Sequence, residues 1–420
     1  MHKRIAILGS TGSIGTTALR VIDGLNASLA KDERFEVAAL SGHSNIKLLA
    51  EQVKRYKPKY AAVTDADYVG QFRRLIEGEK VDSTRSPQVE ILTGAEGLEE
   101  IAEAEGIDTV LAAVVGVAGL QAALAAVRRG KPFDSAQGRR VAIANKEPLV
   151  IAGRLITGEA KKHGAQILPV DSEHSAIFQA LAAGRREEVE KIVLTTSGGP
   201  FRGATAEEIR EATIEQVLAH PVWRMGKKIT VDSATMMNKA LEIIEAMWLF
   251  DIPAEKIEVL VHPQSIVHSL VEFVDGSVIA QMGAPDMALP IQYALTYPAR
   301  MAGIAKKLRL EQLRTLTFES VDAKVFPAIE MGFEVAKKGG TAAAVFNAAN
   351  EAAVEGFLAG RIKFGNIVEL VRHCLDACEY KSDATLAELL EADSWAKKEV
   401  KECLKSQRTE SRRQRTQAGH

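Results

Sequence analysis

The stretch ILGSTGSIG, residues 7–15, decides the fold of the N-terminal part of the chain. It places Gly9, Gly12 and Gly15 three residues apart, after the apolar run RIAIL and before the helical pattern TTALRVIDGL. Glycines at a strand-to-helix turn let the backbone approach a pyrophosphate, whose charge is held by amides at the helix N-terminus. A glycine triplet alone is a weak signal. Because this one follows a strand and opens a helix, it predicts a dinucleotide-binding turn.

Apolar runs alternate with helical patterns through the first half of the chain. The later runs read FEVAAL, YAAVT, TVLAAVV, VAIAN, AQILPV and KIVLTT. Near-continuously apolar strands separated by helices predict a parallel sheet covered on both faces, with ligands bound beyond the carboxyl ends of the strands. Those ends read GSTGSIG, NKEP, DSEH and SGGP, and all are polar, small or charged.

The pattern changes after about residue 255. KIEVLVHPQSIVHSLVEF and SVIAQMG, joined by VDG, predict strands with a hairpin, and residues from about 320 onward read as helices. We therefore expect an α/β fold with an N-terminal Rossmann-type parallel sheet, a central α/β domain with a mixed sheet and a C-terminal all-helical domain. The expected boundaries are 1–168, 169–300, a linker 301–325, 326–404 and a disordered, basic tail 405–420.

Composition excludes several classes of protein. The chain has 420 residues, 46% hydrophobic and 26% charged, as globular proteins do, and its formal net charge of -2 argues against nucleic-acid binding. The longest apolar stretch, 109–127, is broken by glycines, so we expect no membrane span. The N-terminus runs directly into a strand, which predicts no targeting peptide and a cytoplasmic protein. Three cysteines, all after residue 373, do not form a disulfide framework. Cys374 and Cys378 are four residues apart on an expected helix, but zinc binding by this pair is disfavoured because two further Cys or His at ligand spacing are missing.

The end of the second strand bears on the choice of nucleotide. An enzyme that binds the ribose 2′-hydroxyl of NAD usually has Asp or Glu there, whereas this chain has Ser41, Gly42, His43, Ser44 and Asn45. The missing carboxylate favours NADP.

The pentapeptide VDSEH, residues 170–174, allows two interpretations. If Asp171 and Glu173 keep the extended backbone of the preceding strand, both carboxylates point to one face and would need a proton or a cation between them. Alternatively, Asp171 or Ser172 caps the next helix. From these five residues alone, capping is favoured.

The segment VDSATMMNKALEIIEAMWLF, residues 231–250, favours the metal interpretation. Ser233 stands where a helix cap is expected, and a helix N-terminus favours an anion such as phosphate. Asn238, Lys239 and Glu242 share one helix face. Together with Asp171 and Glu173, Glu242 gives three hard oxygen ligands for Mg²⁺ or Mn²⁺.

Three further segments offer polar groups. Lys146 in ANKEP either neutralises a substrate oxygen or forms an ordinary surface pair, and Ser197 in TSGGP either holds a phosphate or makes a turn. HPVWRMGKK, residues 220–228, reads equally well as a lid that expels water or as a loop packed on its own domain.

Taken in order, these motifs resemble one family, 1-deoxy-D-xylulose 5-phosphate reductoisomerase. The matching strings include ILGSTGSIG, ANKE, LPVDSEH, SGGPFR, VDSATMMNK, HPQSIVHS, GAPDM and NAANEAAV, and they run to about residue 400. The resemblance implies an NADPH-dependent rearrangement and reduction of the phosphosugar 1-deoxy-D-xylulose 5-phosphate to 2-C-methyl-D-erythritol 4-phosphate, in isoprenoid precursor biosynthesis. It also implies one divalent metal ion (Mg, Mn or Co) and a homodimer. Domain 1–168 would bind NADPH, and domain 169–300 would carry the metal site, the lid and the dimer interface.

Site residues follow from the resemblance by position. The metal ligands would be Asp171, Glu173 and Glu242, and the catalytic residues would be these three with Lys146 and His220. The phosphate pocket would comprise Ser197, Ser233, Asn238 and Lys239. Substrate contacts would also come from Lys146, Ser172 and His220, with a lid of Trp223 and Met225. The nucleotide would contact Gly9, Thr11, Gly12, Ser13, Ile14, Ser44, Asn45, Asn145, Glu147 and Gly226.

The sequence departs from the family pattern at four places. His43, Ser44 and Pro148 replace a glycine, a basic residue and a serine that are frequent in the family, and residues 132–139 look like an inserted surface loop. Two other functions stay open at this point. One is a different NADP-dependent two-domain dehydrogenase, and the other is a nucleotide-binding module without catalysis.

Overall fold

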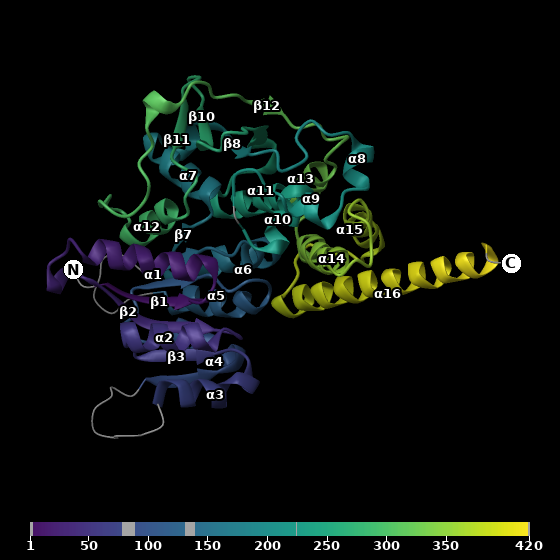
Figure 1. Ribbon diagram of the computed structural model, residues 1–420. Coiled ribbons are helices and arrows are strands. Elements are labelled where there is room, and N and C mark those ends of the chain that lie inside the picture. Colours follow the sequence, from purple (N-terminus) through teal and green to yellow (C-terminus); the bar gives the residue numbers. More distant parts are fainter. Residues whose placement is uncertain (1–2, 78–88, 131–138, 224, 419–420) are drawn as a thin grey trace. The chain divides into compact units, whose positions relative to one another are not determined.

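The structure is a computed structural model that describes residues 3–77, 89–130, 139–223 and 225–418 (Figure 1). The predicted insertion at 132–139 lies almost entirely outside these residues. The chain forms two compact units with interleaved segments. Unit 1 comprises Met1–Pro148, Gly153–Gln179 and Asp286–Leu308; unit 2 comprises Leu149–Ala152, Ala180–Pro285 and Arg309–His420. The predicted domain 169–300 thus contributes to both units, and its boundaries stay a prediction.

Unit 1 contains the predicted parallel sheet. Its strand order is β4-β3-β2-β1-β5-β6-β7, and every neighbouring pair is parallel. The strands are β1 (Lys3–Leu8), β2 (Phe35–Gly42), β3 (Tyr60–Val63), β4 (Glu90–Thr93), β5 (Thr109–Ala112), β6 (Arg140–Ile143) and β7 (Gln166–Pro169). The chain adds strands on one side of β1 up to β4 and then crosses to the other side with β5. The direction in which strands are added therefore reverses at β1. In sheets of this kind a ligand-binding crevice forms at such a switch point, at the carboxyl edge of the strands.

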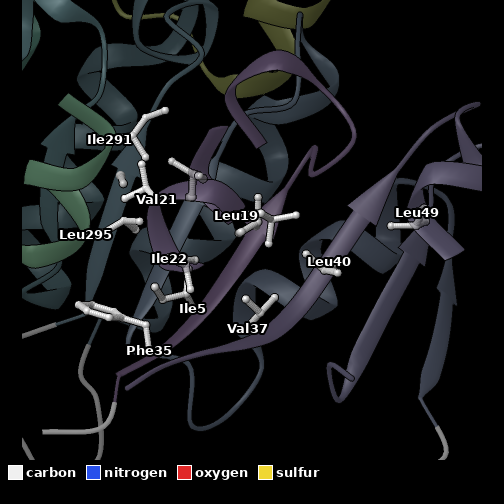
Figure 2. Close-up of a cluster of buried hydrophobic side chains, with 14 of the residues drawn as sticks. Ile5, Leu19, Val21, Ile22, Phe35, Val37, Leu40, Leu49, Ile291 and Leu295 are labelled. Carbon is white, nitrogen blue, oxygen red and sulfur yellow. The ribbon is translucent and has the colours of Figure 1, made fainter. Parts of the chain in front are cut away.

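Helices of unit 1 connect these strands, and their apolar faces build its core. They are α1 (Ser13–Asn26), α2 (Ile46–Tyr56), α3 (Ala66–Glu77), α4 (Gly94–Glu103), α5 (Ala118–Arg129), α6 (Glu147–His163), α7 (Ser172–Ala180) and α12 (Ala288–Thr296). Figure 2 shows Val21 and Ile22 of α1 beside Ile291 and Leu295 of α12, all buried. A helix nearly 270 residues later in the sequence therefore completes the core under α1.

Unit 2 contains a mixed sheet of order β11-β10-β8-β9-β12. Its strands are β8 (Val189–Thr196), β9 (Ile257–Val261), β10 (Val267–Phe273), β11 (Val278–Met282) and β12 (Glu319–Ser320). The predicted hairpin is present, because β10 and β11 are antiparallel and Gly276 in the turn has a φ of 84°. The run KIVLTT continues the series of apolar runs of the first half but lies within the predicted central domain, and it forms β8 of this second sheet. It pairs parallel with β9 and antiparallel with β10, a pairing that its apolar composition does not specify.

The helices of unit 2 include the predicted helical C-terminal region. They are α8 (Ala206–Arg210), α9 (Ile214–Leu218), α10 (Lys227–Ala234), α11 (Met237–Phe250), α13 (Ala328–Lys338), α14 (Thr341–Leu358), α15 (Asn366–Ala377) and α16 (Leu386–Ala418). We expected a disordered tail from 405, whereas the backbone of α16 continues to Ala418. The tail is rich in Gln and Arg, which are good helix formers. A helix that has already formed in the preceding packed turns can therefore extend through the tail.

One strand of the first sheet was not predicted from the sequence. The strand β4 escaped notice because it is a four-residue edge strand with no fully buried residue. Among the described residues, the helices are all too short or too polar to cross a lipid bilayer.

Candidate active site

The glycine loop lies between β1 and α1, as predicted. Gly9 has a φ of 84°, and a Cβ at this position would lie 2.6 Å from the carbonyl oxygen of Ala113, in the loop after β5. A Cβ at Gly15 would lie 2.4 Å from the carbonyl oxygen of Gly9. Gly12 precedes α1, and no side chain caps that helix. Gly9 and Gly15 therefore have no room for a side chain, while the amides at the start of α1 stay available to an anion.

Three side chains outside the set of predicted site residues hold this loop. Ser41, at the end of β2, accepts a 2.8 Å hydrogen bond from the amide of Gly9 at its Oγ. Ser10 Oγ donates to Gln52 Oε1 at 2.6 Å, and Gln52 Nε2 donates back to the Ser10 carbonyl at 2.9 Å. Gln52 is only 5% exposed. The sequence does contain a sign of this contact, because Gln52 is a polar residue on the otherwise apolar face of α2.

Other predicted nucleotide residues surround the same edge. Asn145, after β6, donates to the carbonyls of Val114 and Gly116 at 2.5 and 3.1 Å and so fixes the loop after β5. Asn45 accepts from the amide of Leu48 at 3.4 Å and caps α2. The remaining unit 1 positions flank these at the starts of α1, α2 and α6: Thr11, Ser13, Ile14, Ser44 and Glu147. Gly226 belongs to unit 2.

The VDSEH segment joins β7 to α7. The helix begins at Ser172, so Glu173 lies in its first turn rather than on extended backbone. Asp171 precedes the helix, and its Oδ1 accepts from the amide of Ser172 at 2.9 Å, while Ser172 Oγ donates to the Glu173 carboxylate. The helix-start interpretation is confirmed for the backbone, yet both carboxylates still lie at the carboxyl edge of the sheet.

Lys146 contacts this segment from the end of the neighbouring strand. Its Nζ lies 2.6 Å from Asp171 Oδ2, and the two side chains are 9% and 19% exposed. The surface-pair interpretation is therefore wrong, because neighbouring parallel strands bring these loops together at one buried edge.

The second group of predicted residues lies in unit 2, on α11. Lys239 and Glu242 form an ion pair with side chains only 3% and 1% exposed, and Asn238 Nδ2 donates to the same carboxylate. Ser233 does not cap a helix. It lies in the last turn of α10, and α11 begins after Met236, which adopts a left-handed conformation with a φ of 62°. Residues 227–234 already form a helix, which puts the start of α11 three residues later than the sequence suggested.

Ser197 and His220 are also brought together in unit 2. His220 Nδ1 accepts from the amides of Val222 and Trp223 at 3.2 and 2.9 Å. The ring proton therefore resides on Nε2, which donates to Ser197 Oγ at 3.2 Å. Burial lowers the pKa of His220 below its ordinary value of 6.5, which keeps the ring neutral at pH 7.

The geometry around Ser197 leaves its own proton available. Ser197 Oγ accepts from both His220 Nε2 and the amide of Gly199, the latter at 3.2 Å. A hydroxyl whose oxygen accepts two hydrogen bonds can still donate one, and a phosphate oxygen is a suitable acceptor. Trp223 and Met225 follow on irregular backbone and are half-buried. The structure leaves the lid and the packed-loop interpretations equally open.

The donor groups fit a divalent metal ion of the hard class. Asp171 and Glu173 in unit 1 and Glu242 in unit 2 offer only carboxylate oxygens, the ligands that Mg²⁺ and Mn²⁺ prefer. Glu242 is almost completely buried, and Asp171 is largely so. Buried carboxylates need a positive partner, and Lys146 and Lys239 already supply part of that charge.

A glycine-rich turn at the switch point of a parallel sheet, together with buried lysine–carboxylate pairs, defines a nucleotide-dependent enzyme of the two-unit α/β class. Profiles of the family 1-deoxy-D-xylulose 5-phosphate reductoisomerase match residues 5–153, with its C-terminal domain profiles matching 167–250 and 282–399. A protein of this name from Pelodictyon phaeoclathratiforme is 49% identical over 399 residues, covering 95% of this chain and 99% of the relative. Another, from Rhodopirellula baltica, is 47% identical over 438 residues, covering 95% and 94%. The chain belongs to the 1-deoxy-D-xylulose 5-phosphate reductoisomerase family.

Solved structures agree with this assignment. The reductoisomerase from Zymomonas mobilis in complex with NADPH has a TM-score of 0.85 and 40% identity, covering 97% of this chain and all of its own. A second reductoisomerase, in complex with NADPH, fosmidomycin and magnesium, has a TM-score of 0.86 and 39% identity, covering 96% and 98%. The fold class predicted from the sequence is thereby confirmed.

Proposed function

We propose that this chain is an NADPH- and divalent-metal-dependent enzyme that rearranges and reduces 1-deoxy-D-xylulose 5-phosphate to 2-C-methyl-D-erythritol 4-phosphate, a step in isoprenoid precursor biosynthesis. One observation carries the proposal. Every predicted site residue, from Gly9 to Glu242, falls within the two ranges matched by profiles of this family, 5–153 and 167–250. Solved relatives that match nearly the whole chain bind NADPH and magnesium.

The nucleotide and metal sites follow from the residues described above. NADPH would lie along the loop of Gly9, Gly12 and Gly15, with its pyrophosphate at the start of α1, and would supply a hydride. Asp171, Glu173 and Glu242 would hold the metal ion, which supplies polarisation of the substrate carbonyl and a lowered pKa of the neighbouring hydroxyl.

The remaining residues position the substrate. Lys146 Nζ pairs with Asp171 and orients its carboxylate, and one of the ammonium protons can be donated to a substrate oxygen. Ser197 Oγ donates to the phosphate, while neutral His220 holds that hydroxyl in place. Asn238, Lys239 and Ser233 would complete the phosphate pocket. Binding of the phosphate, away from the reacting carbons, supplies free energy that fixes the reacting atoms in place.

A coupled assay tests the function. Purified protein should oxidise NADPH, followed by its absorbance, only when both the phosphosugar and Mg²⁺ are present, and EDTA should stop the reaction. Oxidation that needs no metal would instead indicate another NADP-dependent dehydrogenase. A folded sample that binds NADPH but never oxidises it would indicate a non-catalytic binding module.

A homodimer is proposed from the edge of the second sheet. Within the described residues, β11 pairs only with β10, and Val278, Ile279 and Met282 on it are 51%, 37% and 36% exposed. An edge strand with exposed apolar side chains is an association surface, and a second copy of this chain is the proposed partner. The cytoplasmic location and the absence of nucleic-acid binding, expected from the sequence, stay predictions.

A further inference from the structure

The cysteines of this chain gather in the C-terminal helical region. Cys374 lies on α15, Cys378 directly follows that helix, and Cys403 lies on α16. The chain has three cysteines in all. They play no part in the function proposed above, so their common location needs a separate explanation.

Three different metal-binding groups meet where α16 packs beside α15. His373 Nε2 lies 2.9 Å from Glu399 Oε1, and Cys403 Sγ lies 4.0 Å from the same oxygen. One ligand atom from each residue can be chosen so that all three lie within 4.8 Å of one another. Glu399 and Cys403 are four residues apart on α16 and therefore share a face, while His373 reaches them from α15.

These distances are close to those of a tetrahedral zinc site. Ligand atoms at about 2.0–2.3 Å from zinc are separated from each other by roughly 3.3–3.8 Å. The pair His373–Glu399 is already closer than this, and the Glu399–Cys403 separation is wider by a few tenths of an ångström. The His373 side chain is 48% exposed and that of Glu399 26%, so both can rotate without disturbing the core.

The chemistry of the donors selects the metal. Imidazole, carboxylate and thiolate all bind Zn²⁺, and the thiolate discriminates against Mg²⁺ and Ca²⁺, which prefer oxygen. We propose that His373, Glu399 and Cys403 form a binding site for Zn²⁺ or a similar borderline-soft divalent cation, with water in the fourth position. This site is separate from the carboxylate site for the catalytic metal.

The location of the site suggests its effect. On α16, Leu389, Ala396, Val400 and Leu404 are buried, so Cys403 lies beside a turn that packs against the other helices of unit 2. A metal ion bound by residues of α15 and α16 ties this turn to its neighbour. Binding to the folded state alone stabilises the fold by mass action. The bound metal ion thus has a structural role, because it holds the C-terminal helix α16 against α15. It has no direct part in the reaction.

Cobalt titration tests the proposal without relying on enzyme activity. The full-length protein, reduced and freed of metal with a chelator, is titrated with Co²⁺. A thiolate-to-cobalt charge-transfer band in the near ultraviolet should grow to one equivalent and disappear when Zn²⁺ is added. The carboxylate site cannot produce this band because it contains no sulfur.

Variants assign the band to the proposed ligands. Cys403→Ser should abolish it, and His373→Ala should weaken Co²⁺ binding by about tenfold or more. Cys378→Ser and Glu242→Gln are matched controls that should retain the band. Circular dichroism confirms that each variant is folded, and His373→Ala, at a half-exposed position, keeps the test valid if Cys403→Ser unfolds. Absence of the band in folded wild-type protein, or its persistence in Cys403→Ser, would overturn the proposal.

Discussion

Asn350 Nδ2 on α14 donates a 2.8 Å hydrogen bond to Asp232 Oδ1 on α10, and both side chains are buried. Asp232 also pairs with Lys228 Nζ at 3.0 Å. The neighbouring residue in the chain is Ser233, a predicted phosphate ligand. The helical C-terminal region therefore fixes the segment that leads into the proposed phosphate pocket, through two residues that lie 118 positions apart.

Asn350→Ala is expected to lower the free energy of unfolding by about 1.5–3 kcal/mol, because it removes the hydrogen bond that Asn350 donates to Oδ1 of the buried Asp232 carboxylate. Urea denaturation measures the change. Asn347→Ala is the matched control, since Asn347 lies on the same helix, is equally buried and makes only a 3.3 Å bond within that helix. Equal losses in the two variants would show that the bond to Asp232 contributes nothing beyond burial.

The glycines of the first loop should differ in what they tolerate. Gly15→Ala introduces a Cβ 2.4 Å from backbone atoms of Gly9 and Ser10, and it should reduce the free energy of unfolding by about 1–3 kcal/mol. A Cβ at Gly12 would have no neighbouring atom closer than 3.4 Å, so Gly12→Ala should lower the free energy of unfolding by less than about 1 kcal/mol. The same substitution should weaken NADPH binding at the start of α1. Denaturation and NADPH fluorescence titrations measure the two effects. A Gly12→Ala variant less stable than Gly15→Ala would contradict this account of the loop.

Glu242→Gln should keep NADPH binding and lose turnover by about a hundredfold or more, because it removes one charged ligand of the proposed metal site while preserving side-chain volume. NADPH titration and the absorbance assay separate the two properties. Unchanged turnover in saturating Mg²⁺ would exclude Glu242 as a metal ligand.

Stability should fall as the pH drops below about 6.5, partly through His268 on β10. Burial is the largest cause of its lowered pKa, and the charges of His262 and Lys239 lower it further, whereas hydrogen bonds with the backbone of Gly283 and Ala284 oppose the shift. A histidine with a lower pKa in the folded state binds more protons when unfolded, so its contribution declines from the ordinary value of 6.5 downward. Denaturation between pH 7 and 5.5 should show a shallower slope for His268→Gln than for wild type. Identical slopes would count against this assignment.

The proposed dimer should dissociate when charge is placed on the exposed edge strand. Val278→Lys puts an ammonium group on β11, where it would be buried without a partner in a dimer interface. Light scattering should report the mass of a monomer. Val115→Lys changes a valine that is 75% exposed in unit 1 and should leave the mass unaltered. A wild-type protein that is already monomeric would refute the dimer.

The sequence by itself determined the features that depend on short-range patterns. Apolar runs and helical periodicity specified the parallel sheet, the hairpin after residue 255 and the helical region, and glycine spacing located the dinucleotide turn. The motifs VDSEH and VDSATMMNK were specific enough to indicate the family, which the comparisons confirmed.

Only the tertiary structure decided which distant residues meet. It placed KIVLTT in the second sheet, added α12 to the first unit and paired Lys146 with Asp171. It also brought Gln52 to the glycine loop and Asn350 to Asp232. The physical reason is that side-chain periodicity reports which face of an element is buried, whereas the choice of neighbour depends on strand order and on how helices cover the sheet. A helix start also depends on where the preceding helix stops, which is why Ser233 looked like a cap and is the end of α10.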